Sequence, residues 1–403
     1  MKIVHVTDYF HPLLGYQDTF LALAALRQGH DVSVVTSDRY RPFESYDETT
    51  GPLLGPRRVG AGRRLEHGID VLRLPVVLEV HFRCWLSGLA KAVQSLHPDL
   101  VIVHGLTTGQ ASRLARMKRR ASVERRAPFS LIVDDHMVPG RDRSVLGRVT
   151  YGIFRHFGAR SILREADAIV AVTASTKRFM MQNYGFAETD ISVIPLGADT
   201  TLFRRRLDRR AELRRKYGYA STDVVFIYAG KITKSKGVDI LVSAALEAME
   251  SHLPMKVMIV GDGPEAFTRA VRRRIDAAGR TADFHWHPPV LNRDLPDLFS
   301  VADVGVWPAR SSLAMIEAQS CELPIIVSSF PAAAERVRDR NGLIFAEGET
   351  HGLANAMLSL MDEAIRREMG RRGRAIVQSD RDYRVLSDRF LALMSRDSTG
   401  IRS

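Results

Sequence analysis

The alternation of short apolar runs with helical segments constrains the fold of this chain more than any other feature. Continuous runs rich in Val and Ile, separated by helices, are typical of parallel strands that are covered on both faces. The series restarts after about residue 198, so it predicts an α/β fold with two doubly wound, Rossmann-like sheets in tandem. The predicted strands are residues 2–6, 31–37, 70–77, 100–105, 131–136, 168–173, 191–196, 224–230, 256–263, 284–289, 304–309 and 325–329.

The length of 403 residues also favours two domains, because it exceeds what one hydrophobic core usually organises. We expect an N-terminal domain over residues 1–198 and a second domain over 199–379, with a C-terminal helix at about 380–403 that packs back onto the first domain. Residues 39–68, rich in Gly, Pro and Arg, are predicted to form a long loop. The acidic pair within 380–382 is predicted to lie on a solvated helix face.

Charge, cysteine content and hydropathy narrow the class of protein. Lys and Arg number 58 against 46 Asp and Glu, and the net charge of +12 favours an anionic partner such as phosphate, nucleic acid or an anionic membrane face. The two cysteines, Cys84 and Cys321, exclude a disulfide framework and a cysteine-rich zinc site. The first apolar run is too short for a signal peptide, and no run approaches the ~20 residues of a spanning helix. We therefore expect a cytoplasmic protein that meets a membrane only from the side.

Doubly wound sheets bind ligands at the carboxyl ends of their strands, and basic residues follow one of these ends. Lys231 comes directly after the strand 224–230, and Lys236 with Gly237 opens a segment of helical apolar spacing. Free N–H groups at a helix start and nearby ammonium groups form an anion site. Two lysines on a solvated loop are the alternative, and the strand–loop–helix context favours phosphate.

A single carboxylate, Glu317, lies near the start of the apolar helix predicted after residue 309. Ser311 or Ser312 is the expected N-cap, which leaves first-turn N–H groups for a ligand at Leu313, Ala314 and Met315. Glu317 is either a first-turn acid favoured by the helix dipole, worth roughly 0.3–1 kcal/mol, or a carboxylate that accepts hydrogen bonds from the diol of a ribose.

Polar residues also follow strands in the first half. Gly15 lies where the loop after the first strand turns into a helix, and Asp18 lies in the first turn of that helix. Asp134, Asp135 and His136 follow the strand 131–136, and His136 is a candidate hydrogen-bond donor or acid–base group. His104 is a weaker candidate of the same kind. The glycines of 259–265 are expected to permit a tight turn rather than to contact a ligand.

Six sequence segments in order give the chain its family resemblance. They are "GYQD", "SVIPLGADTTLF", "AGKITKSKGVDIL", "IVGDGP", "LPDLFSVADVGVWP" and "IEAQSCELPIIVSS". The chain resembles glycosyltransferase family 4, the retaining sugar transferases of GT-B fold, in which two Rossmann-like domains face one another across a cleft. The resemblance implies transfer of a sugar from a nucleotide diphosphate sugar to a glycan or lipid-linked acceptor in cell-surface polysaccharide or glycolipid synthesis. It also implies a retained anomeric configuration and no metal or other cofactor.

The resemblance assigns roles by position. Lys231, where the family usually has Arg, and Lys236 would neutralise the leaving diphosphate, and His136 would contact the donor sugar. Gly15 matches a glycine of the phosphate loop, Tyr16 stands where a second glycine is common, and Glu317 would hold the ribose. The remaining donor-binding positions are Gly230, Ser312, Leu313, Ala314 and Met315.

One position departs from the family pattern. The first glutamate of the paired motif should lie eight residues before Glu317, where this chain has Ala309. Three explanations stay open, in this order: a donor with different hydroxyls, replacement by Arg310 or Ser312, or loss of catalysis. The last would make the chain a non-catalytic sugar-nucleotide-binding subunit. A nucleic-acid-binding protein ranks below both, because the basic runs lack interleaved aromatic residues and any recognised module.

Two basic segments of the first half suggest an anionic surface as a partner. Residues 113–126 hold seven basic residues and one acidic residue. In residues 141–160, arginines interleave with apolar residues that recur every fourth position: Val145, Val149, Ile153 and Phe157. A basic amphipathic helix is typical of an anionic bilayer surface. An ordinary domain helix that buries this face in the core is at least as consistent with the pattern.

Overall fold

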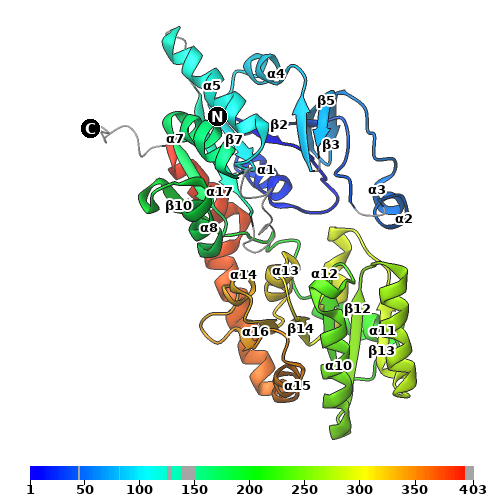
Figure 1. Ribbon diagram of the computed structural model, residues 1–403. Helices are drawn as coiled ribbons and strands as arrows, with labels where there is room; N and C mark the ends of the chain where they lie inside the picture. The colour runs from blue at the N-terminus through cyan, green and yellow to red at the C-terminus, as the bar shows by residue number, and fades with distance from the viewer. Residues whose placement is uncertain (44–45, 81, 125–128, 138–150, 395–403) are drawn as a thin grey trace. The chain divides into compact units, whose positions relative to one another are not determined.

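The chain folds into two compact units. The computed structural model describes residues 1–43, 46–80, 82–124, 129–137 and 151–394 (Figure 1). Unit 1 holds residues 1–196 together with the segment that begins at Tyr383, and unit 2 holds residues 197–382. The chain therefore passes from the first unit to the second at 196/197, where the sequence predicted 198/199.

Unit 1 is built on a sheet in which all neighbouring strands are parallel except the pair β3 and β4. The strand order is β10-β9-β8-β7-β1-β2-β4-β3. The inner strands are buried along nearly their whole length, as their continuous apolar sequences predicted. The strands are β1 (Lys2–Thr7), β2 (Asp31–Ser37), β3 (Gly62–Glu66), β4 (Ile69–Leu74), β7 (Leu100–His104), β8 (Ser130–Asp135), β9 (Ala168–Ala171) and β10 (Ile191–Val193).

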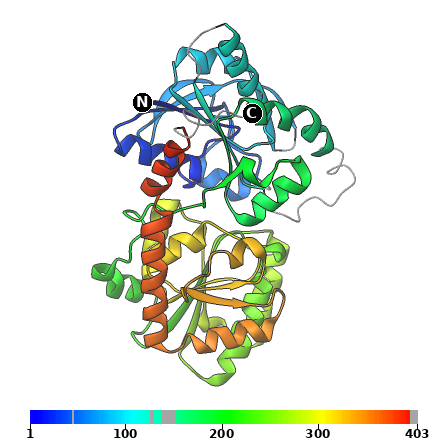
Figure 2. The ribbon, with the colours of Figure 1, turned by 90° about the vertical axis from the view of Figure 1, so that its left-hand side faces the viewer.

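Helices cover both faces of this sheet (Figure 1, Figure 2). The last of them, α17 (Tyr383–Ala392), packs on α1 (Gln17–Arg27): the rings of Tyr383 and Phe20 stack with their centroids 5.1 Å apart. The return of the chain end to the first unit is therefore built from a specific aromatic contact. The other helices are α2 (Tyr46–Thr49), α3 (Gly51–Leu54), α4 (Leu89–Ser95), α5 (Gly109–Val123), η1 (Phe154–Ala159), α7 (Arg160–Glu165), α8 (Ala174–Tyr184) and η2 (Glu188–Asp190).

Unit 2 contains a fully parallel sheet of order β13-β12-β11-β14-β15-β16. Its strands are β11 (Val224–Ala229), β12 (Met255–Val260), β13 (Phe284–His287), β14 (Val304–Trp307), β15 (Ile325–Ser328) and β16 (Gly342–Phe345). The helices around it are α9 (Leu207–Lys216), η3 (Lys234–Lys236), α10 (Val238–Ala248), η4 (Met249–Ser251), α11 (Glu265–Ala277), η5 (Thr281–Asp283), η6 (Asn292–Asp294), α12 (Leu295–Val301), α13 (Ala314–Ser320), α14 (Pro331–Ala334), α15 (Thr350–Ser359), α16 (Glu363–Ile376) and η7 (Val377–Arg381).

The prediction of two doubly wound α/β units is confirmed, and every predicted strand corresponds to a strand of the structure. Among the described residues, four strands were not predicted: β3, β16 and the separate hairpin of β5 (Val76–Val80) and β6 (Arg83–Leu86). Strand β3 is an exposed antiparallel edge with little apolar pattern, so its sequence gave no signal. Residues 39–68 were predicted to form a loop, but within the described residues they contain α2, α3 and β3.

The end of the chain also corrects two predictions. The helix predicted at about 380–403 is found as α17 over Tyr383–Ala392, and residues 395–403 lie outside the described part of the chain. Residues 380–382 do not lie on a solvated face: Arg381 and Asp382 are buried, and Asp382 accepts hydrogen bonds from Thr200. A pattern of charges alone did not reveal that this segment closes back on residue 200.

Candidate active site

Each sheet has one point at which the order of its strands reverses. In unit 2, β12 and β13 lie on one side of β11, whereas β14, β15 and β16 lie on the other. The loops that follow β11 and β14 therefore leave neighbouring strands and diverge, which is where open α/β sheets bind ligands. In unit 1 the corresponding neighbours are β1 and β7.

The two loops at the switch point of unit 2 contact each other. Lys236 lies at the end of the short helix η3, and its Nζ donates a hydrogen bond to the carbonyl of Ser311 at 3.3 Å. Gly237 has a φ of 71°, and a Cβ added there would lie 3.0 Å from the Cβ of Pro308. A glycine is therefore required both by the turn and by the close approach of the second loop. The predicted basic loop and the predicted start of the 314–320 helix are thus brought together.

Helix α10 follows this loop as predicted. Its apolar positions Val238, Leu241, Val242 and Ala245 are all buried. Packing of this face fixes the helix and, with it, the position of Lys236 one residue before the Gly237 N-cap.

Helix α13 begins one or two residues later than the predicted caps imply. Its N-cap residue is Leu313, and no side chain caps it. Ser312 nevertheless contributes, because its Oγ accepts a hydrogen bond from the N–H of Ala314 at 3.3 Å. Met315 is fully buried in the first turn. The side chain of Ser312 is therefore partly engaged in holding the loop.

Glu317 is a buried carboxylate in this first turn. It is 3% exposed, and its Oε1 accepts a hydrogen bond from Nδ2 of Asn292 at 2.8 Å. Burial raises its pKa to about 7, although the hydrogen bond from Asn292 acts in the opposite direction. A glutamate that served only the helix dipole would gain nothing from burial, whereas a carboxylate that receives a ligand at a switch point is commonly perturbed in this way. Asn292 was missed from the sequence, because it belongs to the short helix η6, 25 residues before Glu317.

Gly230 and Lys231 directly follow strand β11. Gly230 has a φ of 152°, and the carbonyl of Lys231 accepts a hydrogen bond from the hydroxyl of Tyr228 at 2.7 Å. The Lys231 side chain is exposed, and its charge partly offsets the rise that burial causes in the pKa of Asp262.

The glycines of 259–265 have a role in backbone packing. A Cβ on Gly261 would lie 2.0 Å from the carbonyl oxygen of Gly230, and one on Gly263 would lie 1.8 Å from that of Ile232. These two glycines thus let the loop after β12 touch the loop after β11, whereas the sequence had indicated only a tight turn.

Ala309, the residue that differs from the family pattern, lies in a tightly packed position. Ala309 is buried, and its carbonyl accepts a hydrogen bond from Ser328 Oγ at 3.0 Å. The guanidinium of Arg310 stacks over the ring of Phe330 at 4.8 Å. Of the two neighbours considered as substitutes for the first glutamate, Arg310 is thus held by an aromatic ring and Ser312 by the backbone of Ala314.

A chain of hydrogen bonds joins three neighbouring strands of unit 1. His5 Nδ1 of β1 lies 2.9 Å from His104 Nε2 of β7, and His104 Nδ1 lies 2.7 Å from Oδ2 of Asp134 on β8. His136, just after β8, places Nε2 3.2 Å from Oδ1 of the same carboxylate. His5 was missed from the sequence, although a histidine in the middle of a buried apolar strand was an available signal.

The negative charge of this hydrogen-bond chain lies on the carboxylate of Asp134. Burial would raise the pKa of Asp134, but His104 and His136 outweigh it and hold that pKa well below its usual range. Removal from water lowers the pKa of His136, but Asp134 overcomes this effect and leaves it raised. Burial and His104 lower the pKa of His5 to about 3, so His5 is neutral.

This cluster is arranged for hydrogen bonding. His104, Asp134 and His136 place potential ligand atoms within 4.8 Å of one another. Both ring nitrogens of His104 are already hydrogen-bonded. The cluster is therefore better explained as a hydrogen-bond chain that orients His136 than as an ion-binding site.

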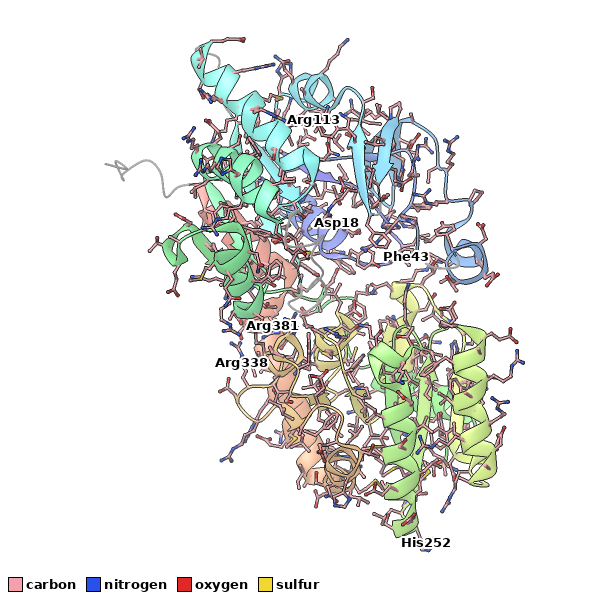
Figure 3. All side chains as sticks on the ribbon, in the orientation of Figure 1. Asp18, Phe43, Arg113, His252, Arg338 and Arg381 are labelled. Atoms are coloured by element: carbon pink, nitrogen blue, oxygen red, sulfur yellow. The ribbon has the colours of Figure 1, made fainter. Side chains whose placement is uncertain are left out.

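The loop before α1 adjoins this cluster. Gly15 has a φ of 65°, and Tyr16 is the N-cap residue of α1 without a side-chain cap. Asp18, labelled in Figure 3, is buried and accepts a hydrogen bond from the N–H of Thr19 at 2.8 Å. Its charge contributes to the raised pKa of His136, so the predicted residues of the first loop and of the β8 end share one electrostatic environment.

Two more acids lie at the carboxyl ends of these strands. Burial raises the pKa of both Asp8 and Asp135 to about 6. Asp8 Oδ1 accepts a hydrogen bond from Gln110 at 3.2 Å, and Asp135 Oδ1 accepts one from the N–H of Met137 at 3.2 Å. Within the described part of the chain, Oδ2 of neither acid has a hydrogen-bond partner, although Nη1 of Arg83 lies 3.9 Å from Oδ2 of Asp8 and forms an ion pair with it. Such oxygens are suited to hydroxyl groups of a ligand.

Solved structures with the same fold define the class. HepE of Anabaena in complex with UDP is similar over 98% of this chain and 100% of its own, with a TM-score of 0.73 and 17% identity. At that identity the likeness shows the fold alone, and the fold is GT-B.

Sequence comparisons then give the family. Residues 19–202 match the model "Glycosyltransferase Family 4" and residues 223–363 match "Glycosyl transferases group 1". The chain belongs to glycosyltransferase family 4.

Among curated relatives, a D-inositol 3-phosphate glycosyltransferase of Acidothermus cellulolyticus is 28% identical over 72% of this chain and 61% of its own length. A GDP-mannose-dependent monoacylated alpha-(1-6)-phosphatidylinositol monomannoside mannosyltransferase of Corynebacterium glutamicum is 24% identical over 60% of this chain and 66% of its own. The chain thus matches about three-fifths of the length of the first of these relatives. None of the helices in the described ranges has the length and apolar character needed to cross a membrane.

Proposed function

We propose that this chain transfers a sugar from a nucleotide diphosphate sugar to a glycan or lipid-linked acceptor, with retention of the anomeric configuration. The observation that carries the proposal is the buried Glu317 at the switch point of unit 2, beside the loop that holds Lys236. A carboxylate and an ammonium group at one switch point match the ribose and the diphosphate of a nucleotide. The acceptor class places the reaction in cell-surface polysaccharide or glycolipid synthesis, on the cytoplasmic side of the membrane.

A protein of the same fold and a curated relative have names that are consistent with the two halves of the substrate pair. HepE was crystallised with UDP, and the Corynebacterium glutamicum relative is named for GDP-mannose and for an acylated phosphatidylinositol acceptor. UDP and GDP-mannose share a nucleoside diphosphate, and it is this element that Glu317 and Lys236 are proposed to bind.

The chemistry proposed for the donor is charge stabilisation. As the sugar departs, negative charge grows on the diphosphate oxygens. Lys231, Lys236 and backbone N–H groups at the start of α13 are preorganised to receive it. His136, whose protonated form Asp134 favours, donates a hydrogen bond to the donor sugar. In this proposal no side chain acts as a nucleophile and no metal ion is required.

The alanine at position 309 bears on which donor sugar is proposed. Without a carboxylate at this position, the donor sugar lacks the acidic contact that the family usually provides for one hydroxyl. We therefore propose a donor whose hydroxyls differ from those of the common family substrates.

The experiment begins with binding. Thermal-shift titrations with UDP, GDP and ADP, followed by their sugars, should reveal one preferred nucleoside diphosphate. The preferred donor is then incubated with lipid and glycan acceptors, with and without EDTA, and the product's anomeric configuration is determined by NMR. Release of nucleotide with a retained configuration supports the proposal. Binding without turnover on any acceptor would instead identify a sugar-nucleotide-binding subunit, and no binding at all would refute the site.

A further inference from the structure

The hairpin of β5 and β6 in unit 1 has two faces of opposite character. Its strands pair with each other and not with the large sheet, and Glu79 stands opposite Cys84 on the inner face. Glu79 accepts a hydrogen bond from the hydroxyl of Tyr9 at 2.7 Å and pairs with Arg39 at 3.1 Å, and Cys84 is 3% exposed. The hairpin is therefore anchored to the unit through this inner face.

The outer face is apolar and exposed. Leu78 stands opposite Trp85 in the antiparallel register, and Val80 stands opposite Arg83. Five of the sixteen large hydrophobic side chains that are exposed among the described residues belong to this one hairpin: Val77, Leu78, Val80, Phe82 and Trp85. Unit 2 exposes such side chains only at separate places, at Leu207, Leu253, Ile344 and Ile365. Concentration on one small element, and not exposure as such, marks an interaction surface.

Arginines frame this apolar face. The guanidinium of Arg41 lies over the ring of Phe82 at 4.8 Å, and that of Arg113 lies over the ring of Trp85 at 4.8 Å. Arg83, from the hairpin itself, donates a hydrogen bond to Thr107 Oγ1 at 2.5 Å. The acid of the hairpin, Glu79, is used on the inner face, so the outer face presents cations and apolar groups together.

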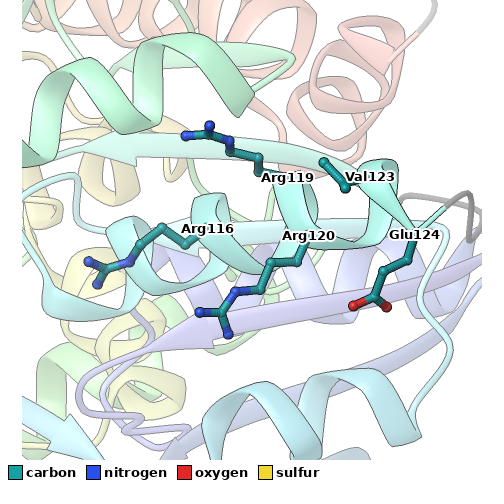
Figure 4. Close-up of a pocket in the computed structure, with 5 residues that line it drawn as sticks. All are labelled: Arg116, Arg119, Arg120, Val123 and Glu124. Atoms are coloured by element: carbon teal, nitrogen blue, oxygen red, sulfur yellow. The ribbon is translucent and has the colours of Figure 1, made fainter.

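Helix α5 extends the cationic surface away from the hairpin. Arg113, labelled in Figure 3, is followed at helical spacing by Arg116 and Arg120, which are both exposed. Arg116 and Arg120 line a shallow hollow of about 290 Å³ together with Arg119, Val123 and Glu124. In Figure 4 the side chains of Arg116 and Arg120 project toward the same side of the helix, whereas Arg119 projects toward the other. Lys118 does not belong to this surface, because it is buried against Asp167.

We propose that the outer face of the β5–β6 hairpin and the Arg113–Arg116–Arg120 stripe of α5 form one docking surface for an anionic lipid bilayer. Aromatic and aliphatic side chains beside arginines are suited to the boundary between headgroups and acyl chains, and the cations are complementary to anionic headgroups. The inference deepens the proposed function, since it names the surface that would bring unit 1 to a lipid-linked acceptor.

The second segment that the sequence suggested adds support only in part. Ile153 and Phe157 are 58% and 73% exposed, so these two residues are not buried in the core as an ordinary domain helix would require. Val145 and Val149 lie outside the described residues, and the proposal does not use this segment.

Binding to vesicles tests the surface directly. The wild-type chain is expected to cosediment at least tenfold more strongly with vesicles of phosphatidylglycerol and phosphatidylcholine than with phosphatidylcholine alone. The double variant Leu78→Thr/Val80→Thr, which places residues of high strand propensity at both positions, should lose at least tenfold of that binding. The double variant Arg116→Gln/Arg120→Gln should lose binding and its salt dependence together. The matched control is Leu253→Thr/Ile344→Thr, which removes two comparably exposed apolar side chains from unit 2 and should bind as wild type.

Tryptophan fluorescence locates the contact. Trp85 lies on the proposed surface, whereas Trp286 and Trp307 belong to unit 2. Vesicles with brominated acyl chains should quench wild-type fluorescence, and Trp85→Phe should remove that quenching while cosedimentation persists. Binding without Trp85 quenching would place the lipid contact elsewhere and overturn the proposal, as would equal binding by the hairpin variant. Capture of a protein instead of lipid by the same face would overturn it as well.

Failure of the docking surface can be distinguished from failure of the proposed function. Each variant is also tested for a thermal shift with the preferred nucleoside diphosphate, which none of these substitutions should change. If the wild-type chain binds nucleotide but does not bind vesicles, the docking surface alone is refuted. Vesicle binding without any nucleotide binding refutes the proposed function alone.

Discussion

Replacement of Glu317 by Gln should stabilise the unliganded protein at alkaline pH. Burial raises the pKa of Glu317 to about 7 from its ordinary value of 4.5. The folded state therefore binds the proton more tightly than the unfolded state, and stability falls as pH rises from about 4.5 to 7. A difference of about 2.5 pKa units corresponds to about 3 kcal/mol above pH 7. Glutamine keeps the oxygen that accepts from Asn292 and carries no charge, so it should recover most of that amount.

Thermal unfolding measures this effect. For a unit of this size, about 3 kcal/mol corresponds to a rise of about 6–12 °C in the midpoint at pH 8. The same substitution should change little below pH 4.5, where glutamate is mostly protonated in both states. Glu347→Gln in the same unit is the control, because Glu347 is exposed and should show neither effect.

The same variant should bind nucleotide more weakly. Loss of charged hydrogen bonds to the ribose should cost about 1–3 kcal/mol, or roughly fivefold to 150-fold in Kd by calorimetry. A residue that is unfavourable for stability and favourable for binding is expected at a functional site. Unchanged melting at pH 8 would refute the electrostatic argument, and unchanged nucleotide affinity would refute the assignment of the ribose.

Three further perturbations test other parts of the site. Lys236→Ala should lower turnover by at least tenfold with the fold intact by circular dichroism, whereas Lys234→Ala in the same exposed turn should keep wild-type turnover; equal rates would remove Lys236 from the site. Asp134→Asn should lower the pKa of His136, which NMR of the imidazole can follow. The same substitution should destabilise the protein more at pH 5.5 than at pH 8.5, because a histidine whose pKa is raised in the folded state contributes stability below pH 6.5, and this stability disappears as pH rises through the folded-state pKa. An unshifted His136 titration would contradict the hydrogen-bond chain. Gly261→Ala should cost about 2–3 kcal/mol in urea unfolding, since its Cβ would meet a backbone carbonyl at 2.0 Å; a loss below about 0.5 kcal/mol would show that the two loops can separate.

The sequence was sufficient for the elements that bury themselves on both faces. Parallel strands such as 224–229 need continuous apolar residues, and helices such as 238–248 need apolar residues at helical spacing, so both patterns are local and visible. The edge strand 62–66 was not visible in this way, and the edge strand 342–345 is apolar but only four residues long. Whether such short segments form strands depends on pairing with a neighbouring strand, β4 for the first and β15 for the second.

The residues of the candidate site likewise fall into those that the sequence could predict and those that it could not. Lys231, Lys236, His136 and Glu317 could be named because they follow strands or open helices, which is a property of the chain order. Asn292 and His5 could not, because each acquires its role from a partner distant in sequence: Glu317 in one case and His104 in the other.

The order of apolar runs and turn residues thus determined, by itself, that the protein has two doubly wound sheets and which loops leave their carboxyl ends. Only the tertiary structure decided which of those polar groups lose water and which acquire partners. Burial of Glu317 and the sharing of Asp134 by two imidazoles arise when segments far apart in the chain pack together. Ionisation depends on that local environment, and no linear pattern of residue types encodes it.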